Sequence, residues 1–281
     1  MSVSARIDCH RYLSFSLFTG SQLSFQLPRL PDIDIMGVFT RSRIRLPTGY
    51  TLNYNVGIAI WLVPSPSTSY ELQQIMDFRP SQSKSNCRTS YPHFAPHVTL
   101  ASGLPPSISM ASVLACIRDQ ASLPVMFKSI HVGDTYFSSV SISIHHSPKL
   151  SALRQHINNE LQKLGVEPCG GRFHMSLYYI DDSEADERYL VADELLNSRR
   201  VVQDGRDRIA LNCFADDRYH LVGHSGFDGE QIWVVKCIGP VEKWEVLEKV
   251  TLFQPWSTTN PSSMQSYFPI YIGKMYNDTW S

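Results

Sequence analysis

Apolar runs of strand length alternate with amphipathic stretches of helix length through the middle of this chain. The clearest run is VGIAIWLV at 56–63, which ends before Pro64 and predicts a buried strand. The next stretch predicts a helix that Ser69 caps and that continues to about Phe78. Further strands are predicted at 94–101, 125–132, 136–145, 172–180, 208–214, 219–223 and 231–238.

Further helices are predicted from capping residues and from apolar positions at helical spacing. Ser147 and Pro148 suit the first positions of a helix that Gly165 can close. The remaining helices are predicted from Ser109, from Asp181 or Asp182 to about Leu196, and over 241–252. Strands and helices are thus mixed, and the Gly133-Asp134 pair between two strands indicates a hairpin. This order predicts an α+β fold with largely antiparallel sheets rather than a doubly wound parallel sheet.

The two ends of the chain lack this periodicity. Residues 1–53 carry six Arg and three Asp but no Lys, and residues 253–281 are rich in Ser, Thr, Pro and aromatic residues. We therefore expect one domain at 54–252, with a poorly ordered N-terminal extension at 1–53 and a poorly ordered tail at 253–281.

Net charge narrows the class of partner. The 281 residues hold 25 Lys and Arg against 26 Asp and Glu, for a formal charge of −1, and the middle region 54–252 carries about −4. Proteins that bind duplex nucleic acid present a basic surface, so we expect no duplex partner. Small nucleotides and RNA ends remain open as ligands.

Cysteine spacing argues against a structural zinc protein, and hydropathy argues against a membrane-spanning protein. None of the six cysteines forms a C-x-x-C pair, which argues against a structural zinc site, and one or two disulfides stay possible. No apolar run reaches the roughly 18 residues of a transmembrane helix. We therefore expect a protein without a membrane-spanning segment.

A short pattern occurs twice, 77 residues apart. PHVTL at 96–100 and FHMSL at 173–177 each contain a histidine, an apolar residue, a hydroxyl residue and a leucine. In a strand, residues two apart point to the same face, so His97 projects with Thr99 and His174 with Ser176. Roughly two His-x-Ser/Thr matches are expected by chance for ten histidines, and the third match, at His145, falls where a strand ends.

Two such pairs suit the hydrolysis of a cyclic phosphodiester. Water must lose a proton as it attacks phosphorus, and the departing sugar oxygen must gain one, which two histidines can do near neutral pH. The two hydroxyls can donate hydrogen bonds to phosphoryl oxygens. This chemistry requires no metal or cofactor. The alternative for either histidine alone is a structural strand residue, and it is the repetition in matching context that favours catalysis.

At these residues the chain resembles the two-histidine (2H) phosphoesterase superfamily, and within it the fungal and plant 2′,3′-cyclic-nucleotide 3′-phosphodiesterases. The resemblance covers roughly 56–250 and rests on GIAIWLVP, PHVTL, FHMSLYY and IWVVKCIGPVEKWEVL. It implies a bilobal, LigT-like α+β fold, with two antiparallel sheets facing a central cleft and helices outside. Each lobe of that fold supplies one His-x-Thr/Ser strand.

The resemblance also implies the activity. His97 and His174 become the acid–base pair, and Thr99 and Ser176 bind the phosphate. The implied reactions are hydrolysis of 2′,3′-cyclic nucleotides to nucleoside 2′-phosphates, and of ADP-ribose 1″,2″-cyclic phosphate, a product of tRNA splicing, to ADP-ribose 1″-phosphate. We assign His174 as the base on water and His97 as the acid to the 3′ oxygen, and the sequence leaves the opposite assignment open.

Two aromatic positions match the family's base-binding residues. Trp61 shares a strand face with the small Gly57 and Ala59, which leaves room for a flat base, and its alternative is a core tryptophan. Tyr179 is five residues after His174, an odd offset that would turn it away in a regular strand. Tyr178 has the matching parity. We expect Tyr179 to contact the base if the strand ends or bulges there, with Tyr178 as the alternative.

Other functions stay open beside this one. A 2H enzyme that acts on RNA 3′ ends, as an exonuclease or a 2′-5′ ligase-like enzyme, is the first alternative, and a non-catalytic nucleotide-binding module is the second. The Ser-rich loop at 79–93 could cover the cleft. We expect a cytoplasmic monomer whose partner is a small cyclic nucleotide, with association to the Golgi as for some fungal relatives also open.

Overall fold

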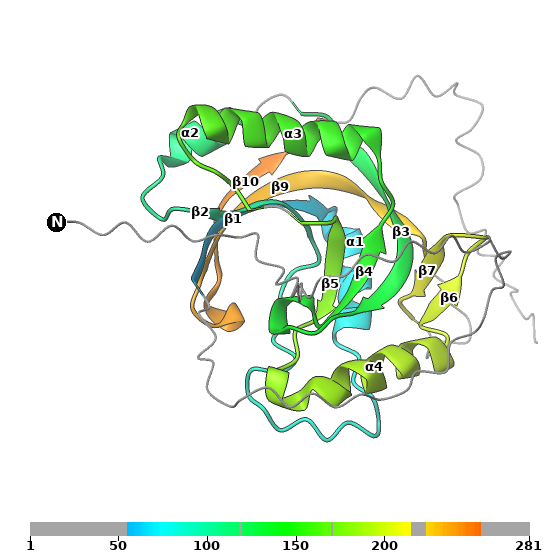
Figure 1. Ribbon diagram of the computed structural model, residues 1–281. Coiled ribbons are helices and arrows are strands. Elements are labelled where there is room, and N and C mark those ends of the chain that lie inside the picture. The colour runs from blue at the N-terminus through cyan, green and yellow to red at the C-terminus, as the bar shows by residue number, and fades with distance from the viewer. Residues whose placement is uncertain (1–54, 118–119, 170, 215–222, 254–281) are drawn as a thin grey trace, which may run out of the picture. The chain divides into compact units, whose positions relative to one another are not determined.

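The computed structural model describes residues 55–117, 120–169, 171–214 and 223–253 (Figure 1). The chain divides into Met1–Asn53 and Tyr54–Ser281, and all of the described residues belong to the second unit. Its strands are β1 Asn55–Pro64, β2 Val98–Leu104, β3 Leu123–Val132, β4 Val140–Ile144, β5 His174–Tyr178, β6 Val201–Gln203, β7 Ile209–Asn212, β8 Gly223–His224, β9 Gly226–Ile238 and β10 Glu245–Thr251. Its helices are α1 Pro66–Met76, α2 Met110–Ala115, α3 Pro148–Lys163 and α4 Ala185–Asn197, with 3₁₀ turns at Tyr136–Ser138, Asp182–Glu184 and Val241–Lys243.

The main sheet is antiparallel and curves back on itself. Its order is β1-β2-β5-β4-β3-β9-β10, and β9 pairs with β1 as well. The long β9 makes this possible, because its beginning pairs with β3 through Gly226–Gly229 and its remainder pairs with β1 up to Ile238. The α+β class with antiparallel pairing is therefore confirmed. The strands expected in two separate sheets join here into one curved sheet, while β6, β7 and β8 form a small second sheet.

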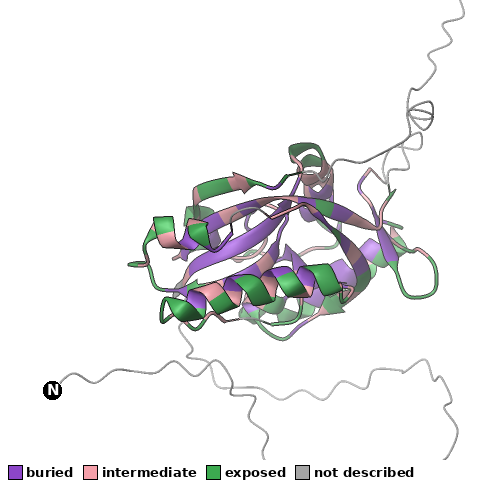
Figure 2. Cartoon of the chain, turned by 90° about the horizontal axis from the view of Figure 1, so that it is seen from above, coloured by how far each residue is buried: buried purple, intermediate pink, exposed green. Residues whose placement is uncertain are grey.

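The helices cover the outside of the curved sheet. Figure 1 shows α3 on one side and α4 on the opposite side, with the main sheet between them. The buried residues of α3 recur at helical spacing and give it a buried stripe and an exposed one (Figure 2). They are Leu150, Leu153, Ile157 and Leu161. This packing leaves the concave face of the sheet for the residues described below.

Capping chemistry sets where the helices begin. The hydroxyls of Ser109 and Ser147 accept hydrogen bonds from the backbone N–H groups of Ser112 and Leu150, as the sequence predicts for N-caps. The first helix begins earlier than expected. Ser65 caps it, rather than Ser69, because Pro66 can occupy the first helical position, where no N–H is required.

Other predicted elements differ from the observed ones in type or in bounds. The strand predicted at 94–101 is β2, Val98–Leu104, and the helix predicted from Asp181 or Asp182 begins at Ala185 after a 3₁₀ turn. The region 241–252, predicted as a helix, contains a 3₁₀ turn and then strand β10, which pairs with β9 from Glu245 to Thr251. Here the free edge of β9 outweighs local helix propensity, which is a weak preference. The strand predicted over 136–145 is shorter, because 136–138 form a 3₁₀ turn before β4. Most of the strand predicted at 219–223 lies outside the described residues.

The described residues also bear on the predictions about a membrane span and about disulfides. No helix among the described residues is long and apolar enough to cross a membrane. Cys87, Cys116, Cys213 and Cys237 are free thiols, and burial raises the pKa of Cys213 and of Cys237 to about 12. These two thiols are therefore protonated and unreactive near neutral pH.

Candidate active site

Strands β2 and β5 bring the two His-x-Thr/Ser motifs together. The strands are antiparallel neighbours, and Val98 pairs with Met175. Val98 and Met175 are fully buried under the helices, as strand alternation requires when the motif side chains point to the other face. The sequence-predicted residues His97, Thr99, His174 and Ser176 therefore lie on two adjacent segments of one sheet.

His97 is almost completely buried and is contacted through both its ring face and Nδ1. Its ring stacks on the indole of Trp61, with centroids 3.6 Å apart and 9° between the planes. Its Nδ1 lies 2.7 Å from the carbonyl oxygen of Ala95. Burial lowers the pKa of His97 to about 4, which the hydrogen bond to Ala95 opposes and the nearby charge of His174 reinforces. His97 is therefore neutral at neutral pH in the ligand-free protein.

His174 has the same local arrangement but is more exposed to solvent. Its Nδ1 lies 3.0 Å from the carbonyl oxygen of Arg172, two residues earlier, just as His97 contacts Ala95. A carbonyl oxygen can only accept, so Nδ1 carries the proton in both rings. In the neutral imidazole this leaves the lone pair on Nε2. Each histidine thus offers Nε2 for proton transfer.

Strand β4 adds two hydroxyls that lie outside the His-x-Thr/Ser motifs. Ser141 pairs with Ser176 and Ser143 pairs with His174 across β4 and β5, so their side chains share one face. Ser141 and Ser176 are both buried. The alternating sequence VSISI at 140–144 predicts that Ser141 and Ser143 share one strand face. It does not predict that this face lies beside the second motif, because that depends on which strand pairs with β4.

A bulge in β5 determines which tyrosine faces the motif residues. Val140 pairs with Tyr178 but Ser141 pairs with Ser176, so Leu177 is the extra residue. The hydroxyl of Tyr178 donates to the carbonyl of Ile75 at the end of α1, outside the sheet. Tyr179 instead lies near Ser176, whose side chain opposes the rise that burial causes in the pKa of Tyr179. The offset of five from His174 is thus accommodated by the kind of bulge on which the Tyr179 prediction depended.

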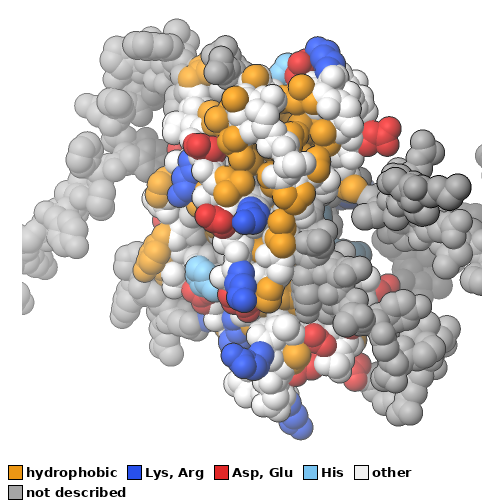
Figure 3. All heavy atoms as spheres, turned by 90° about the vertical axis from the view of Figure 1, so that its left-hand side faces the viewer, with side chains coloured by type: hydrophobic (Ala, Val, Ile, Leu, Met, Phe, Trp, Pro, Cys, Tyr) orange, Lys and Arg blue, Asp and Glu red, His pale blue; other side chains and the backbone are white. Residues whose placement is uncertain are grey.

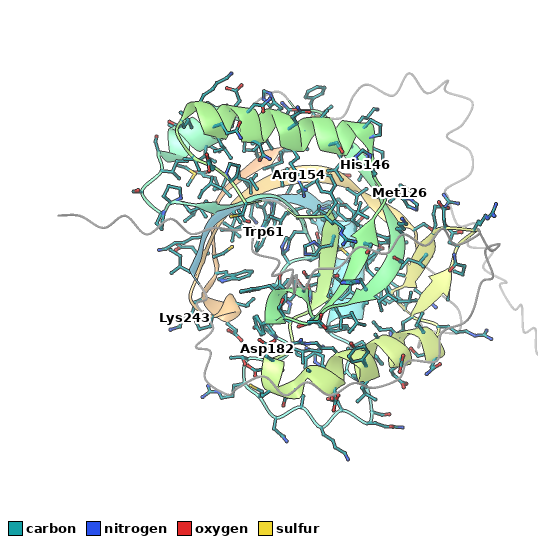
Figure 4. The ribbon with its side chains drawn as sticks, in the orientation of Figure 1. Trp61, Met126, His146, Arg154, Asp182 and Lys243 are labelled. Carbon is teal, nitrogen blue, oxygen red and sulfur yellow. The ribbon has the colours of Figure 1, made fainter. Side chains whose placement is uncertain are left out.

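Aromatic side chains surround His97. Phe94 stacks on Tyr179 at 4.4 Å, and Trp244 lies 5.8 Å from Trp61 and 6.1 Å from Tyr179. Figure 4 shows Trp61 inside the curve of the main sheet. Trp61 and Tyr179 are each only 4% exposed. Trp61 is therefore a packed residue whose indole already stacks on an imidazole, while Phe94 and Trp244 belong to the same aromatic group although the motifs did not identify them.

The Ser-rich loop 79–93 is fastened to the start of α4. Glu184 accepts hydrogen bonds from the hydroxyls of Ser85 and Ser90 and from the backbone N–H groups of Asn86 and Cys87. Asp181 accepts from Thr89. Because the chain continues from this loop through Phe94 to His97, these contacts fix the approach to the first motif.

Histidines outside the two motifs have other surroundings. His145, in the third His-x-Ser match, contacts the carbonyl of Asp207 through Nε2 at 2.8 Å. His224 lies 2.6 Å from Glu71, and His93 is exposed. His220 lies outside the described residues. Among the residues that the structure describes, no group of three His, Cys, Asp or Glu side chains could hold a metal ion.

The chain is similar to one curated protein and to several proteins of known structure. A 2′,3′-cyclic-nucleotide 3′-phosphodiesterase from Kluyveromyces lactis is 27% identical over 221 residues, which is 70% of this chain and 99% of the yeast protein. Crystal structures of Escherichia coli LigT complexed with NADP+ and of TT0787 from Thermus thermophilus are 12% and 16% identical, each with a TM-score of 0.40. They cover 71% and 70% of this chain, and 99% and 98% of their own.

A family profile assigns the chain. The profile described as "Cyclic phosphodiesterase-like protein" matches residues 56–252, which includes both motifs and every strand from β1 to β10 except the first residue of β1. Because this match spans well over half of the chain, the protein belongs to the cyclic phosphodiesterase-like family.

Proposed function

We propose that this protein hydrolyses 2′,3′-cyclic nucleotides to nucleoside 2′-phosphates, and ADP-ribose 1″,2″-cyclic phosphate to ADP-ribose 1″-phosphate. The observation that carries the proposal is the pairing of the two His-x-Thr/Ser segments, through Val98 and Met175, on one sheet. Membership of the family and the name of the yeast relative support the reaction class.

The proposed mechanism uses the two histidines as base and acid. Nε2 of His174 takes a proton from water as the water oxygen forms a bond to phosphorus. The bond between phosphorus and the 3′ oxygen then breaks, and Nε2 of His97 gives its proton to that oxygen. The product keeps its phosphate on the 2′ oxygen. Each positioned acid or base typically contributes about 10²–10⁴-fold.

Binding must change the protonation of His97 for this assignment to operate. In the ligand-free protein the pKa of His97 is about 4, which leaves little imidazolium at neutral pH. A cyclic phosphate carries a negative charge, and an anion beside an imidazole raises its pKa. Bound substrate therefore favours the imidazolium form of His97, which takes its proton from solvent. The reverse assignment, with His97 as the base, requires no such shift, and the two are separated experimentally below.

Hydroxyls and aromatic rings complete the proposed site. Thr99 and Ser176 donate hydrogen bonds to the phosphoryl oxygens, and Ser141 lies beside Ser176 as a further donor. Tyr179 contacts the base from the end of β5. The proposed contact of Trp61 with the base has to use the indole face that His97 leaves free, since its other face stacks on the imidazole.

A product assay tests the proposal. The protein is incubated in EDTA with 2′,3′-cyclic AMP and with ADP-ribose 1″,2″-cyclic phosphate, and the position of the phosphate in each product is identified. We expect the 2′-phosphate and the 1″-phosphate, and a loss of about 10²–10⁴-fold in His97→Ala and in His174→Ala. His145→Ala is the matched control, because it removes the third His-x-Ser match, whose contact is with Asp207.

The same assay decides between the alternatives. Cleavage of RNA 3′ ends without turnover of the small cyclic phosphates would indicate the RNA-end activity, which the charge of about −4 on residues 54–252 disfavours. Binding of a cyclic nucleotide without turnover would indicate a non-catalytic module. Full turnover in a His97→Ala/His174→Ala double variant would refute the mechanism.

A further inference from the structure

We propose that Arg154 is a positioning residue that sets the spacing between the two histidine motifs. Arg154 belongs to α3, and Figure 4 shows it on the side of the helix that faces the main sheet. The proposal rests on the proposed function, because the spacing matters only if His97 and His174 act together.

The ladder between β2 and β5 is interrupted where the motifs lie. Within the described residues, Val98 and Met175 form the one register pair between these strands, and an isolated bridge joins Ser102 to Cys169 further along. Ser102 is four positions after Val98, whereas Cys169 is six positions before Met175. The two extra residues on the β5 side prevent regular pairing just before His174.

The guanidinium of Arg154 bridges this interruption. It donates to the carbonyl of Thr99 at 2.7 Å and to the carbonyl of Gly171 at 2.5 Å. Its central carbon also lies 3.4 Å from the centre of the Phe173 ring. A planar guanidinium can hold two acceptors in fixed directions and stack on an aromatic ring at the same time. Arg154 thus links β2 to the segment that precedes β5, where the described residues form no register pair.

Each contact of Arg154 is next to a motif residue. Thr99 is itself the hydroxyl residue of the first motif, and Phe173 immediately precedes His174. Gly171 leads to Arg172, whose carbonyl contacts Nδ1 of His174. A shift of the guanidinium therefore moves the backbone on which His174 is oriented, relative to the backbone of Thr99.

The charge of Arg154 persists at neutral pH although the side chain is largely enclosed. Burial lowers its pKa to about 10, still well above neutrality. Its Nε is buried without a hydrogen-bond partner in the described part of the chain. The contacts of this side chain in the described part of the chain are thus with two carbonyls and a ring, and none is with a carboxylate.

Two substitutions separate positioning from simple stabilisation. Arg154→Gln removes the fork, and Arg154→Lys keeps the charge and the stem but presents a single ammonium that cannot bridge both carbonyls in the same way. Lys149→Gln is the matched control, because it removes one positive charge from an exposed position of the same helix. Thermal unfolding is measured for all three variants.

The readouts are kinetics and the histidine spectra of the full-length protein. We expect kcat for 2′,3′-cyclic AMP to fall roughly 10–100-fold in both Arg154 variants with KM little changed, because a misplacement of about 1 Å can cost 10²-fold. In ligand-free protein with ¹³C-labelled histidine, the imidazole signals of His97 and His174 should shift in these variants and stay in place in Lys149→Gln.

One result would overturn the positioning role of Arg154. It is an Arg154→Lys protein that is folded, with wild-type kcat and unmoved signals from both imidazoles. If the wild-type protein hydrolyses no cyclic phosphate, the proposed function fails, while the spectra still decide whether Arg154 orients the histidines. Loss of folding in Arg154→Gln alone leaves the decision to Arg154→Lys.

Discussion

His97 is stabilised as a neutral imidazole, and this has a consequence for stability that needs no substrate. Its pKa is about 4 in the folded protein, against about 6.5 for an unperturbed histidine. Between these values the unfolded chain binds a proton that the folded protein does not, so stability falls as the pH falls. From pH 7 to pH 4 this single group costs on the order of 3 kcal/mol of unfolding free energy.

Replacing His97 tests this directly. His97→Gln should lose less unfolding free energy than the wild-type protein when the pH is lowered from 7 to 5, as measured by denaturant titration at both values. His93→Gln, at an exposed position, should follow the wild-type protein. Parallel losses in His97→Gln and wild type would show that His97 titrates normally.

A substrate with a different leaving group can show which histidine acts as the acid and which as the base. A 2′,3′-cyclic substrate with sulfur in place of the 3′ oxygen expels a thiolate, which needs no acid because a thiol has a pKa near 8.5. If His97 is the acid, His97→Ala should recover most of its lost turnover with this substrate, and His174→Ala should not. Recovery in His174→Ala instead would reverse the assignment.

The two tyrosines at the end of β5 make a matched pair. Tyr178→Phe removes a buried hydrogen bond to Ile75, so it should lower the unfolding free energy by about 1 kcal/mol and leave kcat/KM unchanged. Tyr179→Ala should raise KM for 2′,3′-cyclic AMP, because the proposed base contact is lost. An increase in KM in Tyr178→Phe, with none in Tyr179→Ala, would favour the alternative of a regular strand parity in solution.

These residues also show how far the sequence reaches at this scale. His97, Thr99, His174 and Ser176 could be named as candidates because each pair lies within three consecutive residues, and their catalytic role stays a prediction. Ser141 and Arg154 could not, because their contacts depend on which distant strand or loop lies opposite. Tyr179 is intermediate, since its direction depends on a bulge that exists only once β4 pairs with β5.

At the scale of elements, the start of α4 and the loop 79–93 form one unit. The hydroxyls and backbone donors of the loop lower the pKa of Glu184 although partial burial opposes the shift. Glu184→Ala should therefore release the loop, and trypsin should cut it faster after Lys84 and after Arg88. Asp193→Ala, at an exposed position of the same helix, is the control. Equal cleavage rates in wild type and Glu184→Ala would show that Glu184 does not hold the loop.

The edge strand β10 could not be predicted from its own sequence. The segment 241–252 contains charged residues and apolar residues at a spacing that also suits a helix. It becomes a strand because β9 offers unpaired backbone groups along its length, and Glu245–Thr251 complete them. Helix α3 was predictable because its buried stripe and its Ser147 cap are local. Helix α4 was predictable from its buried stripe, although Asp181 caps the 3₁₀ turn that precedes it and not the helix itself. The edge to which β10 adds is instead formed by the rest of the sheet.

At the scale of the whole molecule, charge agrees with a small ligand. Among the described residues on the face shown in Figure 3, Lys and Arg side chains are interspersed with Asp and Glu and do not form a continuous basic surface. The formal charge of about −4 on residues 54–252 has the same implication. Recognition of a cyclic phosphate by imidazoles and hydroxyls requires no such surface, so the activity on small substrates should depend weakly on salt concentration.

Residues 54–256 are predicted to be sufficient for folding and activity. The family profile spans 56–252, and β1 begins at Asn55. At the other end Phe253 is still tied in, since its N–H donates to Gln120 and its carbonyl accepts from Ser122. A chain trimmed to residues 54–256 should therefore keep the unfolding temperature of the full-length protein and a kcat/KM within about twofold.

A second trimming shows whether the boundary is set by packing. A chain of residues 54–250 loses Leu252, which is 3% exposed and whose N–H donates to the carbonyl of Glu230. Burying a leucine contributes about 1.5–3 kcal/mol, so this chain should unfold at a lower temperature than the 54–256 chain. Equal unfolding temperatures of the two chains would show that Leu252 does not contribute to the stability of the core. Loss of activity in the 54–256 chain would show that residues 1–53 or 257–281 contribute to the function.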